Sequence, residues 1–275
     1  MRDSEFDFIR TFVYERSRIS LGADKRELVA ARLGKRLRAV RMESVGAYCR
    51  LLQAPGGEEE FNHLIDIIST HHTSFFRENG HFEFVRERVV PEMLTRARAE
   101  RWPRFHAWSA ACSSGEEPYS LAIVLTETLQ GKAWPWHIEA TDISHGVLEQ
   151  ACAGIYREDA LEPVPAASRR LHFQRGVGPQ AGNFRVKPEL KSGVSFHALH
   201  LLGGPSPFSG PFQLILCRNV MIYFDRPTQE ELVNKLAAQL VPGGYLLVGH
   251  AESLTNIRHS LQSIKPAVYR RPLAA

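Results

Sequence analysis

Hydrophobic positions in about the first seventy residues follow the spacing of α-helices. A third predicted helix spans 44–52, with Ser44 as its N-cap, and the Pro-Gly-Gly run at 55–57 ends it. A fourth predicted helix covers 58–69. The inward positions of the predicted helices are Phe8, Phe12 and Val13, then Leu28, Val29, Leu33 and Leu37, and finally Phe61, Leu64, Ile65 and Ile68. Because no strand pattern interrupts this stretch, we predict a small all-helical domain.

From Phe105 onward, short apolar runs alternate with helical patterns at 116–129, 144–153 and 227–240. Such alternation is typical of a mostly parallel sheet covered on both faces. The apolar runs are FHAWSAA, HIEATDI, VSFHALH, FQLILCRN and GYLLVGH. The final runs, 260–264 and 267–271, leave no room for a crossover helix between them. They predict a hairpin that adds an antiparallel edge to the sheet.

The interval 155–191 departs from this alternation. Its segments 173–175 and 184–186 flank a Gly/Pro-rich loop, which is the pattern of a hairpin. We therefore predict a small antiparallel β-subdomain inserted at about 155–192. The chain divides into a helical domain (1–72), a linker and active-site segment (73–104) and an α/β domain (105–275) that carries the insertion.

Composition and charge limit the classes of protein to which the chain could belong. The chain has 275 residues, 44% hydrophobic and 23% charged, and no apolar run approaches the roughly 20 residues that cross a bilayer. The N-terminus has no apolar signal segment, so we expect an intracellular protein. The four cysteines form no CxxC pair, which favours neither a zinc site nor a disulfide framework. A net charge of +4 is too modest to indicate nucleic acid by itself.

The stretch WSAACSSGEEPYS ends the first predicted strand with small residues and begins a helix at Glu116 and Glu117. Small side chains let a ligand approach the backbone at the helix N-terminus. Two carboxylates in that first turn would repel phosphate and attract an ammonium or sulfonium group. The pattern therefore favours a ligand with an amino-acid end over a dinucleotide, although both residues could instead only complement the helix dipole.

Asp142 lies at the end of the second predicted strand, where an acidic residue in such folds holds the ribose hydroxyls of a nucleoside. It could also cap the next helix, but Ser144 serves that role as well. The glycine-rich run at 176–182 has the wrong spacing for a dinucleotide fingerprint and predicts a turn. Nucleoside binding is therefore the better interpretation of Asp142.

Two further segments carry polar or charged side chains near the carboxyl ends of the predicted strands. Thr73-Ser-Phe-Phe-Arg77 joins the two domains and presents a guanidinium, although a solvated Arg is the simpler alternative. Arg218, Asn219 and Tyr223 leave the fourth strand at the edge where ligands of these folds bind. The Pro-Pro-aromatic turn found here in many amino-group methyltransferases is missing, which counts against a nitrogen nucleophile.

Taken in order, TSFFRE, WSAACSSGEEPYS, ATDIS, RGVGPQAGNFRV and CRNVMIYFD closely resemble the CheR chemotaxis receptor methyltransferases over nearly the whole chain. The resemblance implies a Rossmann-like fold and transfer of a methyl group from S-adenosylmethionine to receptor glutamates. It implies that cofactor contacts come from His71, Thr73, Arg77, one of Glu116 and Glu117, Asp142, His200, Leu201, Arg218 and Asn219. Arg77 and Tyr223 would face the reacting centre. His71 and His200 stand where the family commonly has Asn.

A basic predicted helix carries Arg32, Lys35, Arg36 and Arg38. Such a face is commonly just solvated, or it could bind a phosphate backbone. The resemblance instead implies contact with the glutamate-rich methylation helices of a receptor. The insertion, with its loop at Gly178, resembles the subdomain that docks a receptor's C-terminal pentapeptide by strand addition. A lid over the cofactor is the alternative.

The sequence also argues against several kinds of catalytic site and partner. A carboxylate is already ionised at neutral pH and needs no general base, and the sequence has no Ser/His/Asp arrangement, HExxH motif or metal cluster. We expect no metal, no nucleic-acid partner and no membrane insertion. We expect a cytoplasmic monomer recruited to membrane receptor arrays. The rivals are a catalytically silent cofactor-binding module, a nicotinamide-dependent oxidoreductase and a nucleic-acid methyltransferase.

Overall fold

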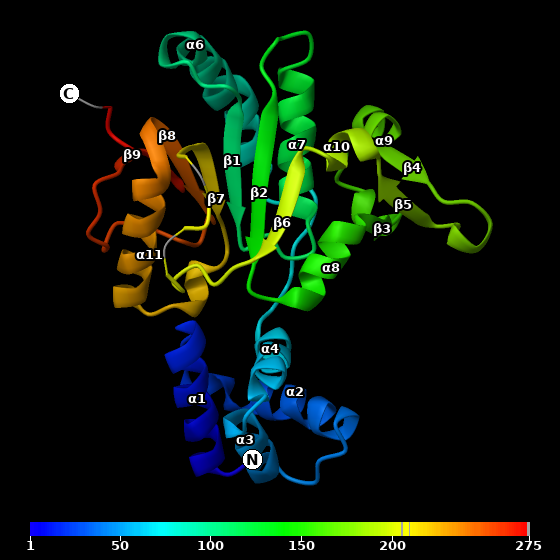
Figure 1. The fold of residues 1–275 in the computed structure, drawn as a ribbon, viewed down its shortest axis with the longest axis vertical. Helices are drawn as coiled ribbons and strands as arrows, with labels where there is room; N and C mark the ends of the chain where they lie inside the picture. The colour runs from blue at the N-terminus through cyan, green and yellow to red at the C-terminus, as the bar shows by residue number, and fades with distance from the viewer. Residues whose placement is uncertain (205, 209, 274–275) are drawn as a thin grey trace.

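The computed structural model describes residues 1–204, 206–208 and 210–273. The N-terminal part is all helical, as predicted: α1 (Asp3–Ser17), a 3₁₀ turn (Ala23–Lys25), α2 (Arg26–Ala39), α3 (Val45–Gln53) and α4 (Gly57–Ile68). These helices lie together below the sheet in Figure 1. Ser44 caps α3 as expected, its hydroxyl accepting the Ala47 N–H at 3.2 Å.

The inward faces of the first two helices differ from prediction. The buried hydrophobic positions of α1 are Phe6, Ile9 and Val13, which follow the i, i+3, i+7 spacing of one helical stripe. Phe8 and Phe12 are half-buried and stack on each other with ring centroids 5.5 Å apart. In α2, Val29 and Leu33 are buried, whereas Leu28 is 41% exposed. The predicted inward positions of α4 are all buried.

The larger part is built on a seven-stranded sheet of order β6-β2-β1-β7-β8-β10-β9. The strands β6, β2, β1, β7 and β8 pair in parallel, and β10 and β9 add the predicted antiparallel edge. The ranges are β1 (Phe105–Ala110), β2 (Trp136–Asp142), β6 (Val194–Ala198), β7 (Phe212–Cys217), β8 (Leu240–Val248), β9 (Gln262–Lys265) and β10 (Val268–Arg270). The carboxyl ends of the parallel strands point toward the helical part (Figure 1).

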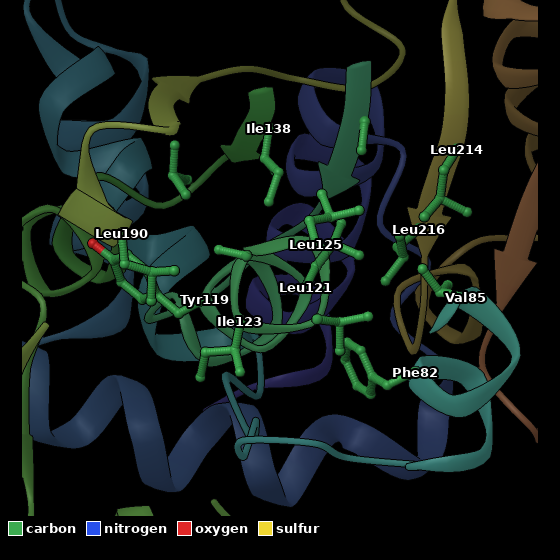
Figure 2. Close-up of a cluster of buried hydrophobic side chains, with 14 of the residues drawn as sticks. Phe82, Val85, Tyr119, Leu121, Ile123, Leu125, Ile138, Leu190, Leu214 and Leu216 are labelled. Atoms are coloured by element: carbon green, nitrogen blue, oxygen red, sulfur yellow. The ribbon is translucent and has the colours of Figure 1, made fainter. Parts of the chain in front are cut away.

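Helices cover both faces of this sheet, and α7 packs deepest. The helices are α5 (Gly80–Phe84), a π-helical turn (Val85–Val89), α6 (Val90–Glu100), α7 (Glu116–Thr128), α8 (His145–Ala153), a 3₁₀ turn (Met221–Tyr223) and α11 (Arg226–Gln239). Leu121, Ile123 and Leu125 of α7 are fully buried among strand residues such as Ile138 and Leu214 (Figure 2). Phe82 and Val85 join this core, so most of the segment expected as a linker is a helical layer of the α/β part.

The insertion forms a separate three-stranded antiparallel sheet of order β3-β5-β4. Its elements are β3 (Ile155–Arg157), a 3₁₀ turn (Asp159–Leu161), α9 (Ala166–His172), β4 (Phe173–Arg175), a 3₁₀ turn (Gly178–Gln180), β5 (Asn183–Val186) and α10 (Pro188–Lys191). The predicted hairpin is β4–β5, and the run at 176–182 is its turn. Strand β3 was not predicted, because three residues carry too little periodicity. Along the described ranges, no helix is long and apolar enough to cross a membrane.

Candidate active site

A cavity of about 940 Å³, its open mouth included, lies where the carboxyl ends of β1, β2 and β7 face the helical part. The structure brings ten of the eleven predicted cofactor and catalytic residues to its wall. They are His71, Thr73, Arg77, Glu117, Asp142, His200, Leu201, Arg218, Asn219 and Tyr223. Glu116 is the exception.

The loop after β1 owes its shape to residues in the left-handed region. Ala111, Ser113 and Gly115 have φ values of 64°, 49° and 98°. A Cβ on Gly115 would lie 2.8 Å from the Tyr156 hydroxyl oxygen and 3.0 Å from the Ala151 Cβ, so only glycine fits there without movement. The loop thereby turns sharply and leaves the first turn of α7 at the cavity wall.

The two neighbouring glutamates of α7 have different surroundings. Glu117 accepts hydrogen bonds from Ser109 Oγ at 2.7 Å and from Arg218 Nη1 at 2.9 Å, and its carboxylate lines the cavity. Glu116 turns away and accepts from Ser114 Oγ at 2.7 Å. Burial raises the pKa of both carboxyls, and for Glu117 the Arg218 charge opposes this effect. The geometry therefore favours Glu117 as the contact for a ligand cation.

Asp142 lies at the end of β2 and is almost fully buried. Its Oδ2 accepts the Ser113 N–H at 2.9 Å and its Oδ1 accepts the Ser144 N–H at 3.0 Å. Burial raises the pKa of this carboxyl, while the two backbone donors act to lower it. Asp142 thus fixes the β1 loop and the entry to α8, where Ser144 is the N-cap, and keeps a carboxylate at the cavity wall.

Arg218 is the centre of an ion-pair network beneath the cavity, with only 1% of its side chain exposed. Its guanidinium donates to Glu117 and to Glu78 at 2.9 Å each, and to the backbone carbonyl of Arg77. Although burial acts to raise the pKa of Glu78, the hydrogen bonds and charge of Arg218 lower it. The network therefore joins the end of β7, α7 and the segment that carries Arg77.

Glu252 holds the turn after β7. Its carboxylate accepts four backbone N–H groups: Asn219 at 2.7 Å, Met221 at 2.8 Å, Ile222 at 3.3 Å and Gly249 at 2.7 Å. Asn219 adopts a left-handed conformation with φ 59°, which this clamp supports. Glu252 thus sets the position of Asn219 and of the turn that ends at Tyr223.

The helical part supplies the opposite wall. The carbonyl of Ser17 accepts from His200 Nε2 at 2.9 Å, and the carbonyl of Tyr223 accepts the Ser20 N–H at 2.8 Å. The Tyr223 hydroxyl donates to the Thr70 carbonyl at 3.2 Å. His71 Nε2 likewise donates to a carbonyl, that of Asp66, at 3.2 Å. Because a carbonyl only accepts, Nε2 carries a proton in both His71 and His200.

The charges around the cavity indicate which class of ligand it can bind. In the cavity wall the carboxylates of Glu117 and Asp142 face the guanidinium groups of Arg77 and Arg218, and Glu78 adds a third carboxylate behind the wall through its bond with Arg218. Such an acidic balance in a buried site attracts a cation and repels phosphate. S-adenosylmethionine, with its ammonium and sulfonium groups and its ribose hydroxyls, fits these residues, whereas a dinucleotide does not.

Glu78, Glu252, Ser17 and Ile19 belong to the site and were not predicted. Glu78 could have been found from its position beside Arg77. Glu252 follows the fifth predicted strand at the edge where ligands bind, so position gave a signal there too. Ser17 and Ile19 gave none, because their contribution depends on how the helical part docks.

The predicted receptor-binding residues of α2 divide into two sets. Arg32 donates to the carbonyls of Ile67, Ile68 and Ser69 at 3.0–3.1 Å, which closes the C-terminus of α4. Arg36 pairs with the buried Glu60. Both are turned toward the protein, whereas Lys35 and Arg38 are exposed. Gly178 lies exposed in the β4–β5 turn with φ 58°.

Both parts of the chain match known proteins. Residues 4–69 match the model "CheR methyltransferase, all-alpha domain", and residues 71–269 match "CheR methyltransferase, SAM binding domain". The chain is 39% identical to a chemotaxis protein methyltransferase of Klebsiella aerogenes, over 98% of this chain and 90% of the relative. It is 39% identical to chemotaxis protein methyltransferase 2 of Pseudomonas aeruginosa (96% and 92% covered).

It is also 38% identical to the chemotaxis protein methyltransferase of Escherichia coli K12, over 98% and 91% of the two chains. Matches over both parts of the chain at this identity rule out an unrelated nicotinamide-binding protein with a similar sheet. The chain therefore belongs to the CheR methyltransferase family, and residues 71–269 are its S-adenosylmethionine-binding domain.

Proposed function

We propose that this methyltransferase esterifies glutamate side chains of methyl-accepting chemotaxis receptors, and that it works as a cytoplasmic monomer recruited to membrane receptor arrays. The position of Arg77 is the observation that supports a carboxylate as the accepting group of the substrate. Its guanidinium lies in the cavity wall and donates to the His72 carbonyl at 2.7 Å, and among the described residues it forms no ion pair. A fork of N–H donors without a carboxylate partner is suited to receive one from a substrate.

Bound S-adenosylmethionine would supply an electrophilic methyl group. Glu117 would hold its ammonium end, Asp142 its ribose, and His71, Thr73, His200, Leu201, Arg218 and Asn219 the rest of the wall. The accepting carboxylate is ionised at neutral pH, so these residues need not remove a proton. Their task is to position the carboxylate and to exclude water, which would otherwise stabilise the separated charges.

Arg77 and Tyr223 would orient the accepting carboxylate. The Arg218 bond to the Arg77 carbonyl and the Tyr223 bond to the Thr70 carbonyl hold the two residues in the cavity wall. We expect Arg77→Lys to lower kcat about a hundredfold, because an ammonium cannot align a carboxylate with two parallel hydrogen bonds. Calorimetry with S-adenosylmethionine serves as the control, since the positive charge is retained. Unchanged methyl transfer would remove the orienting role.

Two surfaces would meet the receptor. Lys35 and Arg38 on α2 carry the exposed positive charge that would attract glutamate-rich methylation helices. In the β-subdomain, β3 and β4 are the edges of a three-stranded sheet, and Val177 beside Gly178 is 79% exposed. Such an edge can accept a receptor's C-terminal peptide as an added strand.

The central test is incubation of the protein with radiolabelled S-adenosylmethionine and receptor-containing membranes. Base-labile label on the receptor protein supports carboxyl methylation. Label on nucleic acid would favour the nucleic-acid methyltransferase, and no label at all would leave a silent cofactor-binding module. Addition of a soluble tail peptide, with binding followed by calorimetry, tests the role of the β-subdomain separately.

A further inference from the structure

Three side chains with metal-ligating atoms gather behind the cavity wall. Glu78 lies two residues before α5, His81 lies within α5, and His250 lies two residues after β8. One ligand atom of each lies within 4.8 Å of the other two, and within the described ranges no other group of three histidine, cysteine or carboxylate donors is so close. Glu78 and His250 are 172 positions apart in the chain, so the fold alone brings the group together and no sequence motif could reveal it.

The buried member of the group is His81, which is only 2% exposed. Its Nδ1 lies 3.6 Å from Oε2 of Glu78, and neither ring nitrogen has a hydrogen-bond partner among the described residues. A polar group buried without a partner destabilises the folded protein, so each such group needs an explanation. Burial and the charge of Arg218 lower the pKa of His81 to about 4, so at pH 7 the imidazole is neutral and one nitrogen keeps a lone pair for a ligand.

The separations within the group are close to those that a small ion requires. With metal–ligand bonds of about 2.0–2.2 Å, two donor atoms of a tetrahedral ion are about 3.4 Å apart. The 3.6 Å between His81 and Glu78 is near this value. The rings of His81 and His250 lie edge to face with centroids 4.7 Å apart, and His250 is exposed, so its side chain can rotate to close the remaining gap. Two imidazoles and one carboxylate leave the fourth position of the ion to water.

We propose that Glu78, His81 and His250 bind one divalent transition-metal ion of the Zn²⁺ type, and that this ion opposes binding of S-adenosylmethionine. Imidazole donors favour Zn²⁺, Co²⁺ or Ni²⁺ over Mg²⁺ and Ca²⁺, which prefer oxygen ligands. His250 at the surface would meet the ion first, and the two inner donors would then enclose it. The ion supplies the partner that the buried imidazole of His81 lacks.

The buried charges around the group are compatible with a dication. Arg218 donates to the carboxylates of Glu78 and Glu117 at 2.9 Å each. The carboxylate of Glu252 accepts the Gly249 N–H directly after β8 at 2.7 Å. Three carboxylates thus accompany one buried guanidinium, and an excess of negative charge in a buried site attracts a cation. A carboxylate has about four lone-pair positions, so Glu78 can bond both Arg218 and an ion.

The opposition to the cofactor follows from the same charges. An ion on Glu78 weakens the bond between that carboxylate and Arg218, which leaves the guanidinium more dependent on Glu117 in the cavity wall. The ion also cancels negative charge beside a cavity whose ligand is cationic. This consequence rests on the cavity being the cofactor site, whereas binding of the ion does not. Because coupling between two sites is reciprocal, the cofactor and the ion should weaken each other by the same factor, about tenfold.

The test uses the full chain without a histidine tag, stripped of metal. Titration with Zn²⁺ by calorimetry and with Co²⁺ by visible absorption should give one ion per chain and a rise in Tm, because the ion binds only the folded state. His250→Ala removes the exposed donor and should weaken binding by roughly 10–100-fold. His145→Ala, which removes an exposed histidine at the start of α8, is the matched control and should change neither the affinity nor the rise in Tm.

His81→Leu tests the buried donor. It removes an imidazole whose nitrogens have no partner, so the metal-free variant should be no less stable than the unaltered protein, while the Zn²⁺-dependent rise in Tm should disappear. Titration of the unaltered chain with Zn²⁺ at saturating S-adenosylmethionine should show affinity about tenfold lower than without the cofactor. In His250→Ala, added Zn²⁺ should no longer lower the affinity for S-adenosylmethionine.

Absence of saturable Zn²⁺ binding would overturn the proposal, as would unchanged Zn²⁺ affinity in both His250→Ala and His81→Leu. Loss of the ion in both variants, with a Zn²⁺ affinity of the unaltered chain that S-adenosylmethionine does not change, would overturn the opposition to the cofactor and support the site alone. None of these titrations depends on methyl transfer, so they stand apart from the proposed function.

Discussion

The half-buried Arg36 of the helical part and the buried Arg218 of the α/β part show how a folding contact differs from a binding site. Arg36 in α2 forms a bidentate pair with Glu60 at 2.8 and 2.7 Å, one guanidinium to one carboxylate. Arg218 at the end of β7 serves two carboxylates, Glu78 and Glu117, at 2.9 Å each. The first pair is electrically balanced, and the second network has an excess of negative charge.

A buried charge without a counter-charge destabilises the folded protein. An excess of buried negative charge is therefore expected where a bound cationic ligand supplies the missing positive charge. The Arg218 network lies at a cavity, and the Arg36 pair does not. The comparison teaches that charge balance, more than the presence of buried ion pairs, marks the binding site in this fold.

Removal of Arg218 should have the largest effect. Arg218→Met leaves the carboxylates of Glu78 and Glu117 without their guanidinium counter-ion, and we expect a loss of about 3–5 kcal/mol in unfolding free energy together with loss of S-adenosylmethionine binding. Urea unfolding and calorimetry measure the two effects. Arg36→Met is the matched variant, and it should lose stability while the folded fraction retains its cofactor Kd. Equal loss of binding in both variants would break the comparison.

Neutralisation of the excess charge should act in the opposite direction on stability. Glu117→Gln keeps the size of the side chain, and we expect cofactor affinity to fall roughly tenfold or more while the ligand-free protein is no less stable, because one buried charge is removed. Glu116→Gln, on the neighbouring side chain that faces away from the cavity, should leave affinity unchanged. The opposite result would identify Glu116 as the cofactor contact.

The contribution of the Arg36–Glu60 pair to the free energy of unfolding should depend on pH. Burial acts to raise the pKa of Glu60, but its hydrogen bonds from Arg36 outweigh this and lower the pKa below its usual 4.5. The ionised form therefore favours folding above about pH 4.5, and this contribution is lost as the pH falls through the lowered pKa. We expect Glu60→Gln to cost about 1.5 kcal/mol at pH 7 and less in acid. A cost that does not vary with pH in urea unfolding would contradict the pairing.

The smallest effect is expected at the surface of α2. Charge reversal of Lys35 and Arg38 should slow receptor methylation several-fold at low salt and less at high salt, because exposed charges are screened. Cofactor affinity should not change. Arg36 is unsuited to this test, since its reversal would place two negative charges together at Glu60. Methylation rates measured across a range of salt concentrations would show whether α2 meets the receptor electrostatically.

The parts of the fold predicted from sequence are those with long periodic patterns. The helical part, the parallel sheet, its antiparallel edge and the β4–β5 hairpin were each predicted. Strand β3 was missed because its three residues have no periodicity, and its pairing with β5 joins segments far apart in the chain. Leu28 was placed inward because hydrophobicity alone does not tell which stripe of α2 meets its neighbours.

Residues of the candidate site also divide into those that could be predicted from the sequence and those that could not. Those directly after strands, such as Asp142 and Arg218, could be predicted, because the topology of a parallel sheet brings strand ends to one edge. Ser17 and Ile19 could not, because their place in the cavity wall depends on how the helical part docks. The inward direction of Arg36 likewise depends on the packing of α2 against α4.

The four-fold clamp of Glu252 on the turn after β7 has a consequence for synthesis. The helical part leaves the ribosome first, and a domain can begin to fold as it emerges. Yet the turn that carries Asn219 and Tyr223 lacks its acceptor until residue 252 is made. A nascent chain that ends shortly before Glu252 would therefore contain every proposed cofactor-contacting side chain and lack the carboxylate that holds this turn, so we expect it to bind the cofactor poorly.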